Sequence, residues 1–213
     1  MLAALLHDVS KPETARRIQG RLRFFKHETR GSTRAAAILK TLRFPNDTVH
    51  TVSTIIAQHL RPGNLAAGAP VTDKAAYRFF RDLGSQAEAA LLVCWADHAS
   101  YMPRRQLARL LSLTSAEPDS DATAKVRPPE ARKTLRHLQV ISQLIRRRFD
   151  TQRPVAPERL IDGHAVMKAL RILPGPLVGK VLEKLREAQA CGRVKTRPQA
   201  LKFVRGLKTE LRA

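Results

Sequence analysis

Residues 2–12 read Leu-Ala-Ala-Leu-Leu-His-Asp-Val-Ser-Lys-Pro, and this stretch organises the interpretation of the whole chain. Its five leading apolar residues predict a helix that reaches the adjacent His7 and Asp8, and Pro12 is typical of a helix end. Imidazole and carboxylate groups both bind divalent metal ions. The pair is therefore a candidate for part of a metal site, although a His-Asp dipeptide alone is a weak signal.

Further candidate ligands follow along the chain. His27, His59 and Asp97 each lie within or beside an apolar helical pattern. They are too far apart in sequence to form a local motif, so they would have to converge from several helices, as in metal sites inside helical bundles. The alternative is that all of them are helix-terminal polar residues that form caps and hydrogen bonds.

The pattern of apolar residues predicts an all-α fold, because no segment of any length alternates as a strand does. Residues 20–26 suit an extended loop. A helix is expected to begin at His27 and end before Pro45, and the next one to reach His59 and stop at residues 61–63. Further helices are expected at 73–83, 85–101, 130–149, 164–171, 176–190 and from 197 onward.

The distribution of charge divides the chain. The formal net charge is +21, of which residues 1–120 contribute +7 and residues 121–213 contribute +14. Such an excess favours a polyanionic partner, most simply RNA, because Lys and Arg neutralise phosphates. A highly soluble protein from a basic proteome is the alternative. Residues 115–129 are polar and contain prolines, so we expect a linker there between a domain at 1–114 and a basic helical tail at 130–213.

Several classes of protein are excluded. The two cysteines, Cys94 and Cys191, match no zinc spacing and suit a reducing compartment. No run of about 18 apolar residues exists, and the N-terminus lacks the features of a signal peptide. We expect a cytoplasmic protein without a membrane span, and the sequence does not indicate an oligomeric state.

Four segments resemble known proteins: ALLHDVSKP (4–12), GRLRFFKHETRGSTRAAAILKTLRF (20–44), IIAQHLRPG (55–63) and LIDGHAVMKALRILPGPLVGKVLEKLREAQACGRVKTRPQAL (160–201). The His-Asp pair and the later candidates resemble the HD superfamily of metal-dependent phosphohydrolases. The amino-acid sequences of the four segments resemble the HD region and C-terminal tail of bacterial tRNA nucleotidyltransferases and poly(A) polymerases. Two positions depart from that pattern, since Ser10 stands where Gly is usual and Ala165 where an acidic residue is usual.

The resemblance implies roles for the candidate residues. It implies an HD-type domain in which His7, Asp8 and Asp97 bind a divalent metal such as Mg, Mn or Ni. His27 and His59 would bind a second metal or contact phosphate. Such a site polarises a phosphoryl oxygen, and Lys11 would offset developing phosphate charge.

The nucleotidyltransferase active site is expected to be absent. It needs a Gly-Ser followed by an Asp-x-Asp pair on a strand, so that two carboxylates hold magnesium ions. Neither Gly31-Ser32, Gly84-Ser85 nor Asp119-Ser120-Asp121 has that context. Only six residues precede His7, and none is a further His ligand, so we expect the chain to be the C-terminal portion of a longer protein.

The basic tail carries the candidate RNA contacts. Arg146, Arg147 and Arg148 form one cluster, while Gly175-Pro176 begins a helix whose free amides attract phosphate. Lys180 and Lys184 add charge one turn apart. Phe24-Phe25, between Arg23 and Lys26, is a candidate platform for base stacking.

Three functions remain open. The chain is the HD and RNA-binding portion of a tRNA nucleotidyltransferase-like protein that binds tRNA or other structured RNA, or a stand-alone HD-type phosphohydrolase. The third is an RNA-binding module whose metal site is vestigial.

Overall fold

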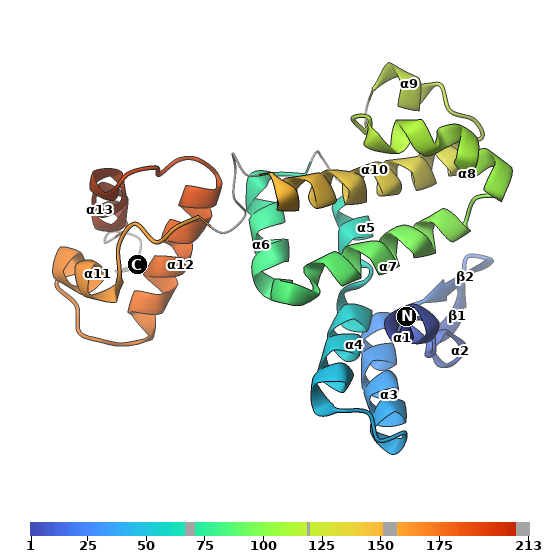
Figure 1. The fold of residues 1–213 in the computed structure, drawn as a ribbon, viewed down its shortest axis with the longest axis horizontal. Coiled ribbons are helices and arrows are strands. Elements are labelled where there is room, and N and C mark those ends of the chain that lie inside the picture. Colours follow the sequence, from blue (N-terminus) through green and yellow to red (C-terminus); the bar gives the residue numbers. More distant parts are fainter. Residues whose placement is uncertain (67–70, 119, 151–156, 208–213) are drawn as a thin grey trace. The chain divides into compact units, whose positions relative to one another are not determined.

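The computed structural model describes residues 1–66, 71–118, 120–150 and 157–207. Helices dominate these ranges, which confirms the predicted all-α class. The helices of the first half are α1 (Leu2–Leu6), α2 (Lys11–Thr14), α3 (His27–Thr41), α4 (Asn46–Gln58), α5 (Arg61–Ala66), α6 (Asp73–Leu83) and α7 (Ala87–Ser100) (Figure 1). Those of the second half are α8 (Arg104–Leu110), α9 (Asp121–Ala124), α10 (Pro129–Phe149), α11 (Gly163–Leu170), α12 (Pro176–Ala190) and α13 (Arg197–Gly206).

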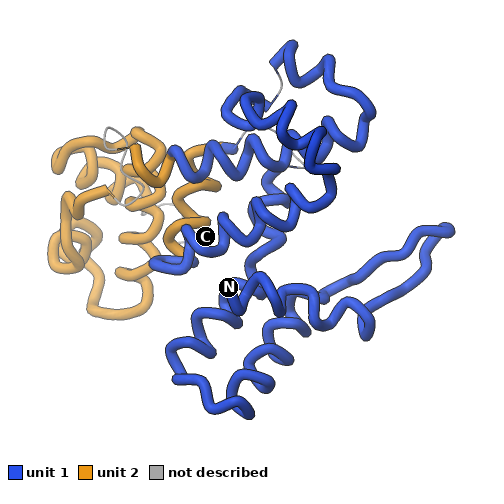
Figure 2. The backbone as a smooth tube through the Cα atoms, turned by 45° about the vertical axis from the view of Figure 1, so that its right-hand side comes forward, with its two compact units in different colours: residues 1–71, 83–146 blue, residues 72–82, 147–213 orange. Residues whose placement is uncertain are grey.

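The chain forms two compact units (Figure 2). Unit 1 contains residues 1–71 and 83–146, and unit 2 contains residues 72–82 and 147–213. The long helix α10, which the sequence pattern assigns to the tail, therefore lies mostly in unit 1. Helix α6 lies in unit 2 although it precedes α7 in sequence.

The core of unit 1 begins with α3 and α4, which pack along each other, while α1 and α7 pack against α4. Buried apolar residues line these contacts at helical spacing: Ala35, Leu39, Val49, Val52, Ile55, Ile56, Leu91 and Cys94. Gly31 allows the close approach of α3 to the end of α1, because a Cβ there would lie 3.3 Å from the carbonyl oxygen of His7. This packing sets the position of the His-Asp pair.

The segment expected to be an extended loop is instead half of a β-hairpin. Strands β1 (Ala15–Ile18) and β2 (Arg21–Phe24) are antiparallel and are joined by Gln19 and Gly20, which both have positive φ. Two such residues form the tight loop that matches the twist of paired strands. The expectation of no strand was therefore wrong in this segment, which forms the only sheet among the described residues.

A second departure follows His59. Residues 61–63 were expected to end a helix, but they begin α5. Pro62 can occupy the first turn of a helix because its missing amide hydrogen has no acceptor there.

Residues 103–146 add α8, α9, most of α10 and a 3-10 turn, Leu111–Ser115, to unit 1. The segment expected to be a linker contains α9, and it contacts α10 because the buried Gln139 amide donates to the Leu113 carbonyl and the Thr123 hydroxyl. The apolar residues of α10 at helical spacing from Leu135 to Leu144 are buried, but Phe149 is exposed. The helix has left the core of unit 1 by that point.

Unit 2 has a small core between α11, α12 and α13, formed mainly by Val166, Leu170, Val181, Leu185 and Val204. Two of these helices begin with side-chain caps: Asp162 accepts from the amide of Ala165, and Thr196 forms a capping box with Gln199. In the described ranges, no helix is long and apolar enough to cross a membrane.

Candidate metal centre

Three histidines are held in the same way in unit 1. His7 follows α1, His27 begins α3 and His59 follows α4. The Nδ1 atom of each ring lies within hydrogen-bonding distance of the carbonyl oxygen three residues earlier, at 2.8, 2.7 and 2.6 Å respectively. A neutral ring that donates from Nδ1 must present the lone pair of Nε2, so the three rings are set to act as ligands through that atom.

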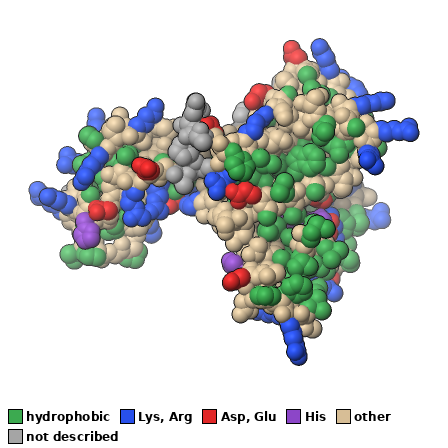
Figure 3. Space-filling view, viewed as in Figure 1, with side chains coloured by type: hydrophobic (Ala, Val, Ile, Leu, Met, Phe, Trp, Pro, Cys, Tyr) green, Lys and Arg blue, Asp and Glu red, His purple; other side chains and the backbone are tan. Residues whose placement is uncertain are grey.

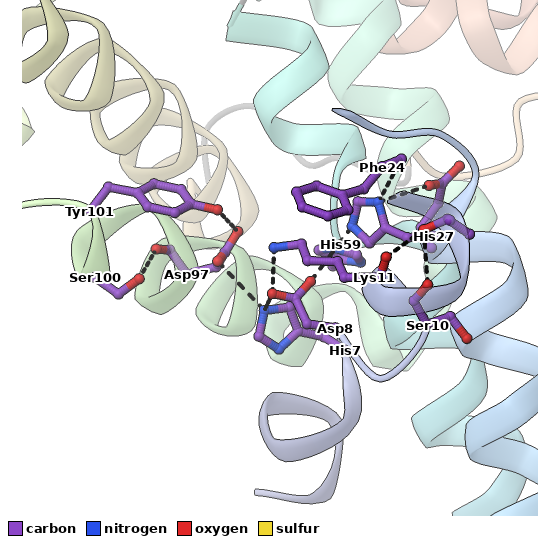
Figure 4. A network of polar contacts seen from close by, with 12 residues as sticks. His7, Asp8, Ser10, Lys11, Phe24, His27, His59, Asp97, Ser100 and Tyr101 are labelled. Carbon is purple, nitrogen blue, oxygen red and sulfur yellow. Dashed lines mark hydrogen bonds and ion pairs between the residues drawn. The ribbon is translucent and has the colours of Figure 1, made fainter. Parts of the chain in front are cut away.

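Two carboxylates complete the cluster (Figure 4). The Nε2 atom of His7 lies 3.3 Å from a carboxylate oxygen of Asp8 and 3.5 Å from one of Asp97, which belongs to α7. The other Asp8 oxygen lies 3.6 Å from Nε2 of His27. Five residues separated by up to 90 positions in the chain thus meet at the ends of α1, α3, α4 and α7.

These side chains form two overlapping sets of potential ligands. In one set, ligand atoms of Asp8, His27 and His59 all lie within 4.8 Å of one another, and in the other those of His7, Asp8 and Asp97 do so. Asp8 belongs to both. The geometry matches what the sequence hypothesis required of His7, Asp8 and Asp97, which had to converge from distant helices.

The buried polar atoms of the cluster fit a metal ion. The Nε2 atoms of His7, His27 and His59 and Oδ1 of Asp8 are buried without a hydrogen-bond partner. Buried polar groups are normally satisfied, because each unpaired one costs free energy. Three imidazole nitrogens and two carboxylates aimed at a common region are a donor set that a divalent ion would satisfy.

The two carboxylates dominate the electrostatics of the cluster. The carboxylates of Asp8 and Asp97, 3.3 and 3.5 Å from Nε2, raise the pKa of His7 to about 10, against the effect of burial. Burial, the largest single influence, would raise the pKa of Asp8 and Asp97. The combined effects of His7 and Lys11 on Asp8, and of His7 and His98 on Asp97, outweigh it and lower both values. Burial lowers the pKa of His59, which is 1% exposed and stays neutral. A cation bound here would compete with the proton on His7.

Lys11 lies at the edge of the cluster. Its amine is 2.5 Å from an Asp8 oxygen and 5.7 Å from the centre of the Phe24 ring. The departure at Ser10 has a simple explanation, since its φ of −104° needs no glycine. Ser10 is fully buried, and its carbonyl accepts from the Thr14 hydroxyl.

The comparisons with known proteins agree with this geometry. Residues 1–102 match the family model of the HD domain. These residues are therefore an HD domain, and they contain all five members of the histidine–carboxylate cluster.

The relatives of the chain are tRNA nucleotidyltransferases. The A-adding tRNA nucleotidyltransferase of Deinococcus radiodurans is 30% identical over 204 residues, which cover 95% of this chain and 40% of that protein. The CC-adding tRNA nucleotidyltransferase of Thermus thermophilus is 34% identical over 207 residues, which cover 95% of this chain and 38% of that protein. The chain thus spans about 40% of the length of these relatives. No solved structure matches it significantly.

A second pair of histidines was not found from sequence. His98 and His137 are half-buried in unit 1 with ring nitrogens 3.2 Å apart. Their separation of 39 residues hides the contact from any local pattern. His50 and His164 are exposed.

The predicted RNA contacts lie in different surroundings. Arg146 donates to the carbonyl of Ser115 at 2.5 Å, and Arg147 pairs with Asp73 at 2.8 Å. Arg148 and Lys184 also have interaction partners, while Gly175 and Lys180 are exposed. The three arginines are therefore engaged within the fold and do not form one free basic cluster. Lys and Arg side chains are spread over the visible face (Figure 3).

The Gly-Ser pairs considered for nucleotidyl transfer lie on helices. Gly31-Ser32 is inside α3, and Gly84-Ser85 begins the 3-10 turn before α7. Asp119, from the only Asp-x-Asp sequence considered, lies outside the described residues.

Proposed function

We propose that the HD domain of this chain is a divalent-metal-dependent phosphohydrolase centre. The observation that carries this proposal is the set of four buried, unpartnered atoms on His7, Asp8, His27 and His59 that face one region. Caps and hydrogen bonds, the alternative roles for these residues, would have used those atoms. A vestigial site would also have little reason to retain them, because unsatisfied buried groups are costly.

Each residue has a role in this proposal. His7, Asp8 and Asp97 would hold one ion, and Asp8, His27 and His59 would hold a second. Three imidazoles favour a transition ion such as Mn²⁺ or Ni²⁺ over Mg²⁺, which prefers oxygen ligands. Bound divalent ions polarise a phosphoryl oxygen and lower the pKa of water. Lys11 keeps Asp8 ionised and places positive charge beside the phosphate.

The test uses small phosphate esters and a matched pair of histidines. His59→Ala removes a buried Nε2, whereas His50→Ala removes an exposed ring within α4, the helix that His59 follows. With Mn²⁺ or Ni²⁺ present, we expect hydrolysis of bis(p-nitrophenyl) phosphate by the parent chain. His59→Ala should lose more than about 100-fold of that activity, and His50→Ala should keep it. Titration calorimetry should show the same order for metal affinity. Equal behaviour of the two variants would contradict the proposal.

We further propose that the chain binds tRNA or other structured RNA. This proposal is favoured by the net charge of +14 in residues 121–213 and by relatives that are tRNA nucleotidyltransferases. RNA duplexes are recognised by shape and phosphate contacts, so little sequence preference is expected. Nucleotidyl transfer is not part of the proposed function.

The RNA test uses residues that are not engaged within the fold. Arg171 and Lys180 lie near the start of α12 and are exposed, and Asn at position 171 accepts the left-handed conformation there. Arg171→Asn with Lys180→Ala should weaken tRNA binding and reduce its salt dependence by about two units of slope. Arg104→Ala with Arg105→Ala removes the same charge from unit 1 as a control. Absence of tRNA binding at about 50 mM salt would contradict the proposal.

A further inference from the structure

The β1–β2 hairpin has a composition that its packing does not explain. Residues 15–26 contain five Lys or Arg residues and no Asp or Glu. None of these five cations has an ion pair or a side-chain hydrogen bond within the part of the chain that the structure describes. The hairpin extends away from the helices of unit 1 (Figure 2), and its residues are almost all exposed.

The strand register gathers three of the arginines on one face. Arg16 pairs with Arg23 and Ile18 pairs with Arg21, so Arg16, Arg21 and Arg23 share a face because side chains alternate along each strand. Arg16 and Arg23 are directly opposite each other. Like charges in that position destabilise a strand pair, so this arrangement costs stability in the isolated protein. An anion between the two guanidinium groups would reverse that cost.

The base of the hairpin joins the histidine–carboxylate cluster. The carbonyl of Phe24, the last residue of β2, accepts from His27, and the Lys11 amine lies over the Phe24 ring. A nucleic-acid backbone held along the hairpin would therefore lead toward the histidine–carboxylate cluster, whose proposed substrates are phosphate esters. Phe25 is 57% exposed beside this base and offers a face on which a nucleobase can stack.

The hairpin does not suit a membrane surface. Ile18 and Leu22 are 45% and 54% exposed, but they lie on opposite faces of the ribbon, since Ile18 pairs with Arg21 and Leu22 with Arg17. Membrane-surface segments gather their apolar residues on one face and their charges on the other. Guanidinium groups instead match the oxygen geometry of phosphates, which they bind in a bidentate manner.

We propose that the face of the hairpin formed by Arg16, Arg21 and Arg23 binds the phosphate backbone of an RNA strand beside the HD centre. This inference rests on the proposed RNA binding and assigns part of it to a surface outside the basic tail. It needs no hydrolysis at the metal centre.

The test is the affinity of the full chain for a fluorescent single-stranded RNA of 12 nucleotides, measured with a chelator present. Arg16→Ala, Arg21→Ala and Arg23→Ala are combined, which also removes the cross-strand repulsion and so spares the hairpin. The matched control combines Arg104→Ala, Arg105→Ala and Arg109→Ala, three exposed cations of α8 in the same unit. We expect the hairpin variant to lose at least about tenfold in affinity and about two units of salt slope, while the control loses far less.

Location is checked by placing the photo-crosslinker p-benzoylphenylalanine at Phe25 or, as control, at Leu111 of unit 1, which is 50% exposed. Crosslinks to RNA from position 25 and none from position 111 are expected. If both triple variants bind RNA equally, the hairpin proposal fails while RNA binding by the chain stands. If the parent chain binds no RNA, both fail. Loss of binding to phosphatidylserine vesicles with unchanged RNA affinity would overturn the proposal in favour of a membrane contact.

Discussion

The histidine–carboxylate cluster of the HD domain and the helices α11–α13 of unit 2 use polar side chains in opposite ways. In the cluster, the histidines and Asp8 leave four buried atoms without partners. In α11–α13, the polar side chains at helix starts satisfy local amides: Asp162 caps α11 and Thr196 caps α13. The first arrangement stores a free-energy cost that a ligand can offset, and the second stabilises the fold directly. Substitutions should therefore affect ligand binding in one region and stability in the other.

The largest effect is expected at Asp8, the residue shared by both sets of ligands. Asp8→Asn should lower metal affinity by more than about 100-fold, beyond the 10- to 100-fold typical of groups that only orient a ligand. Titration calorimetry with Mn²⁺ measures this change. Asp47→Asn, at an exposed position of α4, is the matched control. If Asp8→Asn bound metal as tightly as the parent chain, the cluster could not be distinguished from α11–α13 as a region that serves ligand binding.

In unit 2, Glu187 of α12 is expected to act on stability. Its carboxylate is buried and bonds with Arg78 and with Lys74 of α6, the latter at 3.2 Å. Glu187→Gln should lower the free energy of unfolding by about 1–2 kcal/mol, because the two cations are half exposed and water compensates part of the loss. Denaturant titration measures the change, with Glu158→Gln at an exposed position as control. Metal affinity should not change.

A pH-dependent effect is expected from the His98–His137 pair. Burial, with the nearby His98, lowers the pKa of His137 from 6.5 to about 4. As the pH falls between these values, the unfolded chain takes up a proton that the folded chain does not, so the free energy of unfolding falls. His137→Phe should flatten this dependence in denaturant titrations from pH 7 to 4, whereas His164→Phe should not. Identical profiles for the two variants would mean that the pair does not titrate as described.

The smallest effect is the most direct test of the comparison. His59→Leu removes an unpartnered buried nitrogen and keeps an apolar side chain of similar size. The stability of the protein in chelator should change little, because the gain from removing the unsatisfied Nε2 offsets the loss of the Nδ1 bond to the Ile56 carbonyl. Thermal unfolding in a chelator measures this. A large destabilisation would show that His59 serves the fold, as Glu187 does.

Sequence reasoning succeeded where the signals are local. Pro45 separates α3 from α4, and Thr196 begins α13 as its capping preference predicts. The candidate ligands were identified through a resemblance, and their convergence depended on packing that sequence spacing does not reveal. The hairpin was missed because both of its faces are exposed, so apolar and polar residues do not alternate, and Gln19-Gly20 is a weaker turn signal than Asn-Gly. The His98–His137 contact had no sequence signal.

The way in which the three rings are anchored has a consequence for how the chain tolerates substitution. His7, His27 and His59 bond to the carbonyl oxygens of Ala4, Phe24 and Ile56, and every amino acid supplies that oxygen. The orientation of each imidazole is therefore independent of which side chain stands three positions earlier. Substitutions at residues 4, 24 and 56 can alter packing or contact with a partner without changing the orientation of the three imidazole rings.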